Sequence, residues 1–318
     1  MSEKPTKHTK VLIIGSGPAG YTAAVYAARA MLKPILVYGS EPGGQLTTTT
    51  DVENYPGFAK AIQGPWLMEQ MKEQAHAVGT EMIEDHISSV NLKSKPFEAI
   101  GDGGQKYTAD SIIISTGAQA RWLNLKSEQN YRGFGVSACA TCDGFFFKDK
   151  QVAVVGGGNA AVEGAILIAK YAKKVFLVYR GEKLWRPEPI LLETLNKTEN
   201  VDVLLNNNVI ELIGSDFGGL QKIKFEKEHN NETEYTVDGL MIEAGADPRI
   251  EIPNSLGIDL DIETNEVVVD KDQKTNIDGI YAAGDLTNGS NLKQTITAAS
   301  QGAISALSAY NYCLENKN

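Results

Sequence analysis

Short runs of β-branched and aliphatic residues, each followed by a glycine-rich turn and an alanine-rich segment, recur along the chain. Residues 10–15 (KVLIIG) form the first run, ahead of GSGPAG at 15–20 and an alanine-rich segment at 21–30. Residues 151–156 (QVAVVG) open a second unit of the same kind, with glycines at 156–158 and an alanine-rich segment to about residue 171. An apolar run, a glycine turn and a helical segment in this order predict a buried parallel strand followed by a helix.

Further runs extend both units. Second strands are predicted at 34–38 and 174–179, and a third segment, 279–285, ends in Asp285 and precedes a predicted helix over 295–310. Alternating stretches at 97–100, 107–109 and 223–226 predict antiparallel strands. We expect the N-terminal unit and the C-terminal strand and helix to be parts of one domain. The stretch 120–250, which has its own glycine turn, is therefore expected to be an insertion.

The composition is that of a globular protein, and the net charge argues against two classes of binding partner. The chain has 318 residues, 42% of them hydrophobic and 22% charged, and a formal net charge of −10. An acidic surface repels nucleic-acid phosphates and anionic lipid, so neither is an expected partner. No apolar run approaches the roughly 20 residues that span a bilayer, and the first ten residues lack a signal-peptide pattern. We therefore expect a cytoplasmic protein.

The glycine turns indicate nucleotide binding. Such a turn lets the backbone approach a pyrophosphate, which then binds the amide groups at the start of the helix. One turn is weak evidence, because glycine turns between strand and helix also form for packing reasons. Two in one chain favour two nucleotide cofactors, or one cofactor and a relic of a second site.

The end of the second strand in the second unit bears on which dinucleotide binds there. A carboxylate at this place suits a ribose 2′-OH, whereas arginine suits a 2′-phosphate. Residues 178–186 read VYRGEKLWR, without a carboxylate at the strand end. Arg180 and Arg186, with Lys183 between them, could hold a 2′-phosphate or could be solvated surface cations.

Cys139 and Cys142 form the second chemical motif, in the segment ACATCDG at 138–144. Cysteines at this spacing can close a small redox-active disulfide ring. A zinc site needs four ligands, and the remaining Cys313 and four histidines form no matching pattern. The pair could instead be buried small hydrophobes, but the adjacent Asp143 argues against apolar surroundings. A carboxyl group beside a dithiol can shuttle the proton that thiol–disulfide exchange requires.

Together these motifs resemble those of the low-molecular-weight thioredoxin reductases of bacteria, fungi and plants. Further matching segments are GGQLTTTT at 43–50, ENYPGF at 53–58, STGA at 115–118 and YAAGD at 281–285. The resemblance extends from about residue 10 to residue 312. It implies an α/β fold with two Rossmann-like domains of the three-layer ββα type. A nucleotide-binding domain (119–247) carrying the CxxC pair is inserted into an FAD-binding domain of two segments (1–118 and 248–318).

The resemblance also implies a thioredoxin–disulfide reductase. Electrons pass from NADPH through FAD to the Cys139–Cys142 disulfide. Cys142 is the flavin-side sulfur, Cys139 attacks oxidised thioredoxin, and Asp143 donates and accepts the proton. The residues implied for FAD are Ser16, Gly17, Pro18, Ala19, Gly44, Gln45, Asn54, Ile87, Asp285, Lys293, Gln294 and Thr295. Those implied for NADPH are Gly156, Gly158, Asn159, Ala160, Arg180 and Arg186. The family forms homodimers, and its domains rotate about hinges expected here near 117–119 and 245–250.

Three segments depart from the family pattern. The usual His-Arg-Arg-x-x-x-Arg is here Tyr179-Arg180-Gly181, with Arg186 one position later than usual. Loss of one charge-assisted contact is expected to weaken 2′-phosphate binding by about 1.5–3 kcal/mol. Glu243 stands where the family has an apolar residue, and Lys293 where arginine is frequent. A dinucleotide is still expected, and the electron donor stays open.

Three alternatives therefore remain beside the NADPH-dependent reductase. The altered arginine motif motivates a reductase of the same fold that takes electrons from NADH, ferredoxin or a second flavin. A dithiol oxidase, whose flavin is reoxidised by oxygen, uses the same scaffold, although no substrate-shaped feature points to it. A non-catalytic flavoprotein is disfavoured by the intact Cys139, Cys142 and Asp143.

Overall fold

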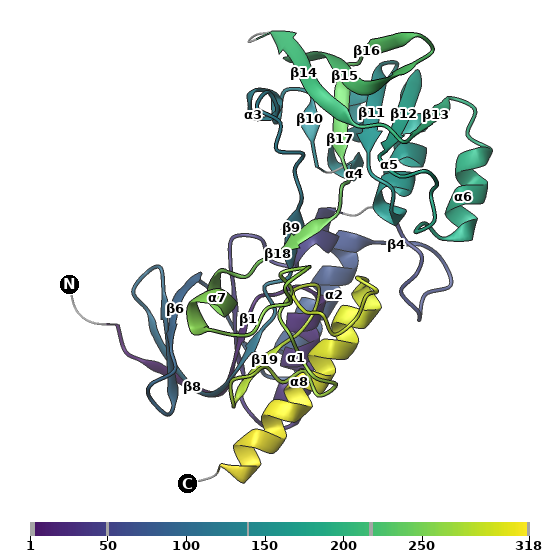
Figure 1. Cartoon of the computed structure of the whole chain (residues 1–318). Coiled ribbons are helices and arrows are strands. Elements are labelled where there is room, and N and C mark those ends of the chain that lie inside the picture. The colour runs from purple at the N-terminus through teal and green to yellow at the C-terminus, as the bar shows by residue number, and fades with distance from the viewer. Residues whose placement is uncertain (1–3, 49–50, 139, 216–218, 317–318) are drawn as a thin grey trace. The chain divides into compact units, whose positions relative to one another are not determined.

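The chain folds into two units, each built around its own sheet (Figure 1). The computed structural model describes residues 4–48, 51–138, 140–215 and 219–316. Unit 1 comprises residues 1–119 and 248–318, and unit 2 comprises residues 120–247. Both are α/β, so the predicted fold class is confirmed.

Unit 1 is organised around a seven-stranded sheet in the order β5-β2-β1-β8-β7-β6, with β19 also paired to β8. Its parallel strands are β1 (Lys7–Ile14), β2 (Ile35–Tyr38), β5 (Glu81–Glu84), β8 (Lys106–Ile114) and β19 (Ile280–Ala282). The strands β6 (Ile87–Asn91) and β7 (Phe97–Gly101) continue it in antiparallel pairing. β3 (Asp51–Val52) and β4 (Ile62–Gln63) form a separate small sheet.

Two helices of unit 1 pack against each other along much of their length, α1 (Pro18–Arg29) and α8 (Thr295–Glu315). The others are α2 (Gly64–Ala77), α7 (Glu251–Leu256) and the 3₁₀ helix η1 (Gly44–Thr48).

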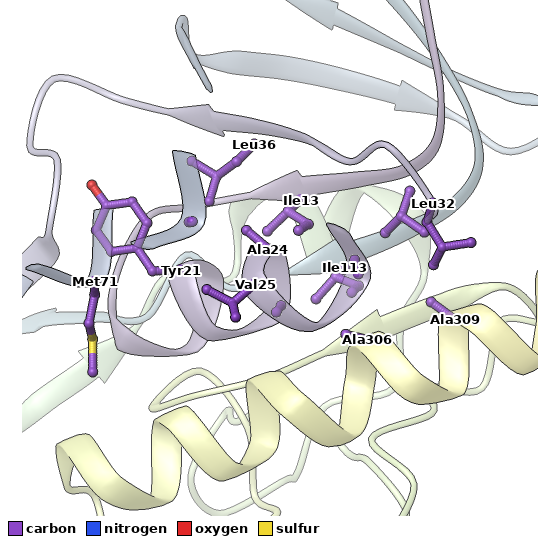
Figure 2. Packing of buried hydrophobic residues seen from close by; sticks show 14 of the residues in the cluster. Ile13, Tyr21, Ala24, Val25, Leu32, Leu36, Met71, Ile113, Ala306 and Ala309 are labelled. Carbon is purple, nitrogen blue, oxygen red and sulfur yellow. The ribbon is translucent and has the colours of Figure 1, made fainter. Parts of the chain in front are cut away.

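Strand β1 is buried on both faces, which explains its uninterrupted apolar run. Val11 and Ile13 belong to a core with α1, α2 and α8, and Leu12 and Ile14 belong to a second core with β6, β7 and β8. Figure 2 shows Ala306 of α8 in the first core, on the side where Val25 of α1 and Ile113 of β8 lie. Small side chains at this contact let the two helices approach closely.

Unit 2 has a five-stranded parallel sheet in the order β10-β17-β11-β12-β13. These strands are β10 (Val136–Ser137), β11 (Gln151–Val155), β12 (Lys174–Tyr179), β13 (Val201–Leu205) and β17 (Gly239–Ile242). An antiparallel sheet follows, with β14 (Val209–Ser215), β15 (Gly219–His229) and β16 (Glu232–Thr236). The helices are α3 (Glu128–Tyr131), α4 (Ala140–Asp143), η2 (Gly144–Phe147), α5 (Asn159–Ala169) and α6 (Pro189–Asn196).

Unit 2 repeats the layering of unit 1. Val152 and Val154 of β11 pack in a core with α5 and α6. Ala153 between them belongs to a core that includes Ile223 and Phe225 of the antiparallel sheet. A parallel sheet between helices and an antiparallel layer is the expected three-layer ββα arrangement.

The crossings between the units are short. β9 (Ala118–Ala120) pairs with β18 (Ala246–Pro248). Gly117 and Gly245 flank these strands with φ of +68° and +97°, and a side chain added at either would meet no atom within 4 Å. Both glycines are therefore in the left-handed region that favours glycine.

Several predicted boundaries differ from those observed: β8 and β15 extend well beyond the predicted 107–109 and 223–226, and two further differences have a clear physical reason. β1 begins at Lys7, because the polar residues ahead of the apolar run pair with the start of β8. Helix α8 continues to Glu315, beyond residue 310, because Tyr312 and Cys313 are buried in the first core. Cys313 is thus a packed side chain, and its thiol donates to the carbonyl of Lys10 at 3.7 Å.

Candidate active site

The first glycine turn is closely packed on one side and open on the other. Gly15 has φ of +107°, and a Cβ there would lie 2.3 Å from the Ser115 carbonyl oxygen. A Cβ at Gly20 would lie 2.0 Å from the Gly15 carbonyl. Gly17, the N-cap of α1, has no atom within 4 Å of such a position, and no side chain caps the helix. The first amides of α1 therefore face a cradle suited to a phosphate group.

A second loop flanks this cradle. The Gly43 amide donates to Ser16 Oγ at 3.3 Å, and a Cβ at Gly44 would lie 3.6 Å from Gly17 Cα. The side chain of Gln45 donates to the Ala118 carbonyl. Pro18 begins α1, a position where its missing N–H is harmless.

Ala19 and Ser115 support the turn from behind. A Cβ at Gly302 of α8 would lie 2.1 Å from the Ala19 carbonyl, so the two helices touch at this point. Ser115 is buried, and its hydroxyl donates to the carbonyls of Ile14 and Gly15 at 3.0 and 3.1 Å. Ser115 lies in the STGA segment, but sequence reasoning assigned it no part in the site.

Asp285 follows β19 and has an unused carboxylate. Among the described residues it accepts no hydrogen bond, and burial raises its pKa, opposed by Lys293 and reinforced by Glu266. Lys293 Nζ lies 2.8 Å from Glu266 Oε1 and donates to the Thr287 carbonyl at 2.5 Å. The charge of Lys293 is therefore shared with Glu266, and Asp285 is left to accept bonds from hydroxyl groups of a ligand.

Asn54 and Gln294 meet although 240 residues separate them. The Asn54 amide donates to Gln294 Oε1 at 3.1 Å. Gln294 is the N-cap of α8, where it forms a reciprocal capping box with Thr297, and Thr295 is the first helical residue. A hydrogen-bonding pair thus lies at a helix start, where a helix dipole favours negative charge.

Ile87 stands apart from the other residues implied for FAD. Its side chain is 2% exposed in the core beneath β6 and β7. Only its backbone is left for a ligand. The residue beside it, His86, has a ring carbon 4.0 Å from a Cβ position on Gly39 at the end of β2.

The second glycine turn, like the first, is closely packed on one side and open on the other. A Cβ at Gly156 would lie 2.1 Å from the Glu243 carbonyl, whereas one at Gly158 would meet nothing within 4 Å. Asn159, the first residue of α5, donates to Glu188 Oε1 at 3.0 Å and accepts from the Glu188 amide at 2.9 Å. Ala160 follows it, exposed.

Tyr179 explains the missing arginine. A Cβ at Gly157 would lie 2.2 Å from its ring and one at Gly181 would lie 2.6 Å from it, so the ring fills the space between the two glycines. A side chain at 181 would have to displace the ring. Nearby cations remain available: Arg180 is exposed with no ion-pair partner in the described ranges, and exposed Arg186 stacks on Trp185 at 4.9 Å.

The CxxC motif spans the short helix α4. Cys139 lies outside the described residues, and Cys142 is the third residue of α4. Asp143 ends α4 and lines a surface pocket of about 420 Å³ together with Phe146 and Lys150. Phe145 and Phe146 are 67% and 69% exposed. These two exposed aromatic side chains come shortly after the CxxC motif in the sequence.

Comparisons with known proteins place the chain in a family. Residues 9–302 match the pyridine nucleotide-disulphide oxidoreductase family. Thioredoxin reductases from Rickettsia felis and Vibrio cholerae are 48% and 47% identical to the chain, covering 94% and 96% of it and 96% and 97% of their own lengths. The crystal structure of Lactococcus lactis thioredoxin reductase in its FR conformation matches with a TM-score of 0.90 and 35% identity, covering 96% of this chain and 99% of that one. The chain belongs to the thioredoxin reductase family.

Membership confirms the resemblance read from the motifs, and it makes the protein an oxidoreductase. It also implies a flavin and a pyridine nucleotide. The described residues contain no group of three or more His, Cys, Asp or Glu side chains placed to hold a metal ion. None of their helices combines the length and the apolarity needed to cross a bilayer.

Glu243 is the departure from the family pattern that the structure makes most informative. It directly follows β17, and its Oε1 accepts a hydrogen bond of 3.2 Å from the amide of Ala140, inside the CxxC motif. Burial raises its pKa from 4.5 to about 7, opposed by that hydrogen bond and reinforced by the charge of Glu163. The sequence identifies Glu243 as a departure from the family pattern but does not indicate that it binds the Ala140 amide.

Proposed function

We propose that the chain is an FAD-dependent thioredoxin–disulfide reductase that takes its hydride from NADPH. Family membership together with the Cys139–Cys142 motif is the observation that carries the proposal. In the overall reaction one NADPH and one proton convert oxidised thioredoxin to its dithiol and release NADP⁺. When bound, FAD supplies the two-electron step between the nicotinamide and the enzyme disulfide.

Unit 1 is the proposed FAD-binding unit. The open amides at Gly17 would hold the pyrophosphate, and the flanking Ser16, Pro18, Ala19 and Gly44 would shape its cradle. The unpartnered carboxylate of Asp285 suits hydroxyl groups of the ribityl chain. The remaining polar residues proposed around the flavin are Gln45, Asn54, Lys293, Gln294 and Thr295, with the backbone of Ile87 near the adenine.

Unit 2 is the proposed NADPH-binding unit. The turn from Gly156 to Gly158, which is open at Gly158, and the start of α5 at Asn159 and Ala160 would hold the pyrophosphate. The exposed cations Arg180 and Arg186 would hold the 2′-phosphate. NADH is the second candidate donor, because Gly181 stands where the family pattern has an arginine, and the ring of Tyr179 fills the space beside it.

The chemistry of the dithiol follows from its residue types. Two electrons open the Cys139–Cys142 disulfide. The Cys139 thiolate then attacks one sulfur of oxidised thioredoxin and displaces the other as a thiolate, forming a mixed disulfide. Cys142 attacks Cys139 of that mixed disulfide, which releases reduced thioredoxin and restores the enzyme disulfide. Asp143 would supply the proton to the leaving thiolate and recover one from the attacking thiol.

Partner and assembly proposals follow from the same assignment. Exposed Phe145 and Phe146 are proposed to contact thioredoxin, because they come shortly after the dithiol in the sequence and Phe146 also lines the pocket at Asp143. The open, left-handed Gly117 and Gly245 are the proposed hinges. A homodimer and a cytoplasmic location are further proposals, the latter resting on the reducing role.

A coupled assay tests the function. Purified protein loaded with FAD receives NADPH and oxidised thioredoxin, and both NADPH loss and new thioredoxin thiols are measured. We expect two thiols for each NADPH consumed, and no turnover in Cys139→Ser. NADPH loss without thiols, with hydrogen peroxide formed in their place, would favour an oxidase and overturn the proposal.

A further inference from the structure

Glu243 binds the start of α4 through the backbone of Ala140, a residue of the CxxC motif. The amide it binds belongs to the peptide group that joins Cys139 to Ala140, so one hydrogen bond of 3.2 Å links the carboxylate to the backbone next to Cys139. Its own position is fixed, because the Glu243 amide donates to the Val155 carbonyl at 2.8 Å, and its carbonyl abuts Gly156. The carboxylate thus reaches from the central sheet of unit 2 to the start of α4.

Helix α5 packs closely against Ala140, next to the Glu243 side chain. A Cβ at Gly164 of α5 would lie 3.0 Å from Ala140 Cβ and 3.9 Å from Glu243 Oε1. Helices α4 and α5 are in contact, and glycine at 164 lets Ala140 approach α5 closely, while the Glu243 carboxylate lies at ordinary contact distance beside them. An apolar residue at 243, as in the family pattern, would leave the Ala140 amide without this acceptor.

Little in the surroundings of Glu243 compensates its negative charge. The neighbouring strand residues Val155 and Ile242 are apolar, and Glu163 on α5 is the charged residue whose field reaches it. The one charged residue of helix α4 is Asp143, which is also acidic. In the sequence both cysteines of the motif precede Asp143. In the described part of unit 2 no cation pairs with Glu243. An ionised carboxylate disfavours a second negative charge on a group close to it.

We propose that Glu243 is a positioning residue of the dithiol: it anchors the start of α4 through the Ala140 amide, and its negative charge disfavours thiolate formation in the CxxC motif. This inference rests on the proposed redox role of the CxxC motif. Because burial raises the pKa of Glu243 to about 7, the anchoring carboxyl is neutral below that pH and charged above it. Reactivity of the reduced dithiol is therefore coupled to protonation of Glu243, a group outside the CxxC motif.

Alkylation of the reduced protein tests the coupling. The FAD-loaded protein is reduced with dithiothreitol, the reductant is removed, and the rate of iodoacetamide modification of Cys139 and Cys142 is followed by mass spectrometry from pH 5.5 to 9. A Cys313→Ser background removes the third thiol, whose pKa burial raises to about 11. We expect the wild-type profile to show an inflection near pH 7 besides that of the thiol itself.

The Glu243→Gln variant retains an acceptor oxygen and loses the charge. We expect it to lack the inflection near pH 7 and to alkylate roughly three- to tenfold faster at pH 8. Glu243→Ala, which resembles the family pattern, removes both charge and acceptor. We expect it to lack the same inflection and, in addition, to accept electrons from reduced FAD more slowly than Glu243→Gln.

A control variant and the possible contrary results distinguish failure of this inference from failure of the proposed function. Glu232→Gln removes one carboxylate on β16 and is expected to keep the wild-type profile. If Glu243→Gln and the wild type gave the same profile, the coupling would be refuted even if thioredoxin were reduced normally. A purely structural role would lower the melting temperature and leave the profile unchanged, which also refutes it. A protein that fails to reduce thioredoxin but shows the inflection would refute only the function.

Discussion

The side-chain amide of Asn54 donates a hydrogen bond to Gln294 Oε1 at 3.1 Å and thereby joins the two sequence segments of unit 1. Gln294 also caps α8. One polar pair thus connects an exposed loop after β3 to the start of the last helix. Both residues are proposed to face the flavin, so their mutual bond would orient each of them toward it.

This pair predicts non-additive effects on flavin affinity. Asn54→Ala and Gln294→Ala should each weaken FAD binding to the apoprotein, because each removes a contact and leaves its partner unoriented. The double variant should lose less than the sum of the single losses, with a coupling free energy of about 0.5–1.5 kcal/mol. Titration of apoprotein with FAD, followed by flavin fluorescence, measures all four affinities. Strictly additive losses would mean that the bond does not matter for binding.

The cations after β12 predict the choice of nucleotide. Arg180→Ala or Arg186→Ala should raise KM for NADPH by roughly 10- to 100-fold, the effect of losing about 1.5–3 kcal/mol of charge-assisted contact. KM for NADH should change little, because it lacks the 2′-phosphate. Lys227→Ala on β15 is a control for loss of an exposed cation. Equal losses for both nucleotides would show that the arginines act on the fold or on the shared pyrophosphate.

Asp143 predicts a separation between the two half-reactions. Asp143→Asn should leave reduction of the flavin by NADPH nearly unchanged and slow dithiol exchange with thioredoxin by roughly 10²–10⁴-fold. Stopped-flow flavin absorbance and thioredoxin thiol release measure the two steps. Asp149→Asn is a suitable control, because Asp149 is exposed and its φ of +61° suits asparagine. Slowing of both steps by the same factor would contradict the assigned role.

The raised pKa of Glu243 predicts how stability depends on pH. Its value is about 7 in the folded protein against 4.5 for an unperturbed glutamate, so folding favours the protonated form. The associated stability is fully present below about pH 4.5 and is lost as the pH rises through 7. Glu243→Gln cannot ionise, so its free energy of unfolding relative to the wild type should increase by up to about 3 kcal/mol between pH 4.5 and 8. Denaturant unfolding at the two pH values measures this difference, and a constant difference would contradict the shift.

Much of the fold was predictable because its signals are local. The runs at Val11–Ile14 and Val152–Val155 alternate between two apolar cores, so neither has a polar face, and each ends in a glycine turn. Such a pattern suits only a strand buried on both sides. The start of β1 was missed, because residues 7–9 are polar and are held by pairing with β8.

The candidate site could be predicted from the sequence only where one short segment carries the proposed chemistry. The cysteine pair, Asp143 and the glycine turns are such segments. The ion pair of Lys293 with Glu266 and the bond from Ala140 to Glu243 join residues 27 and 103 positions apart, and no spacing rule relates them. The ring of Tyr179 likewise explains Gly181 only once both are seen against Gly157.

An anaerobic titration of the FAD-loaded protein tests the central claim most directly. NADPH is added while the flavin absorbance is followed, a parallel sample receives NADH, and oxidised thioredoxin is then added to both. The account predicts bleaching at stoichiometric NADPH, a weaker response to NADH, and return of the absorbance as thioredoxin thiols appear. Bleaching by dithionite alone, with neither nucleotide effective, would contradict it and would mean that electrons enter from another donor.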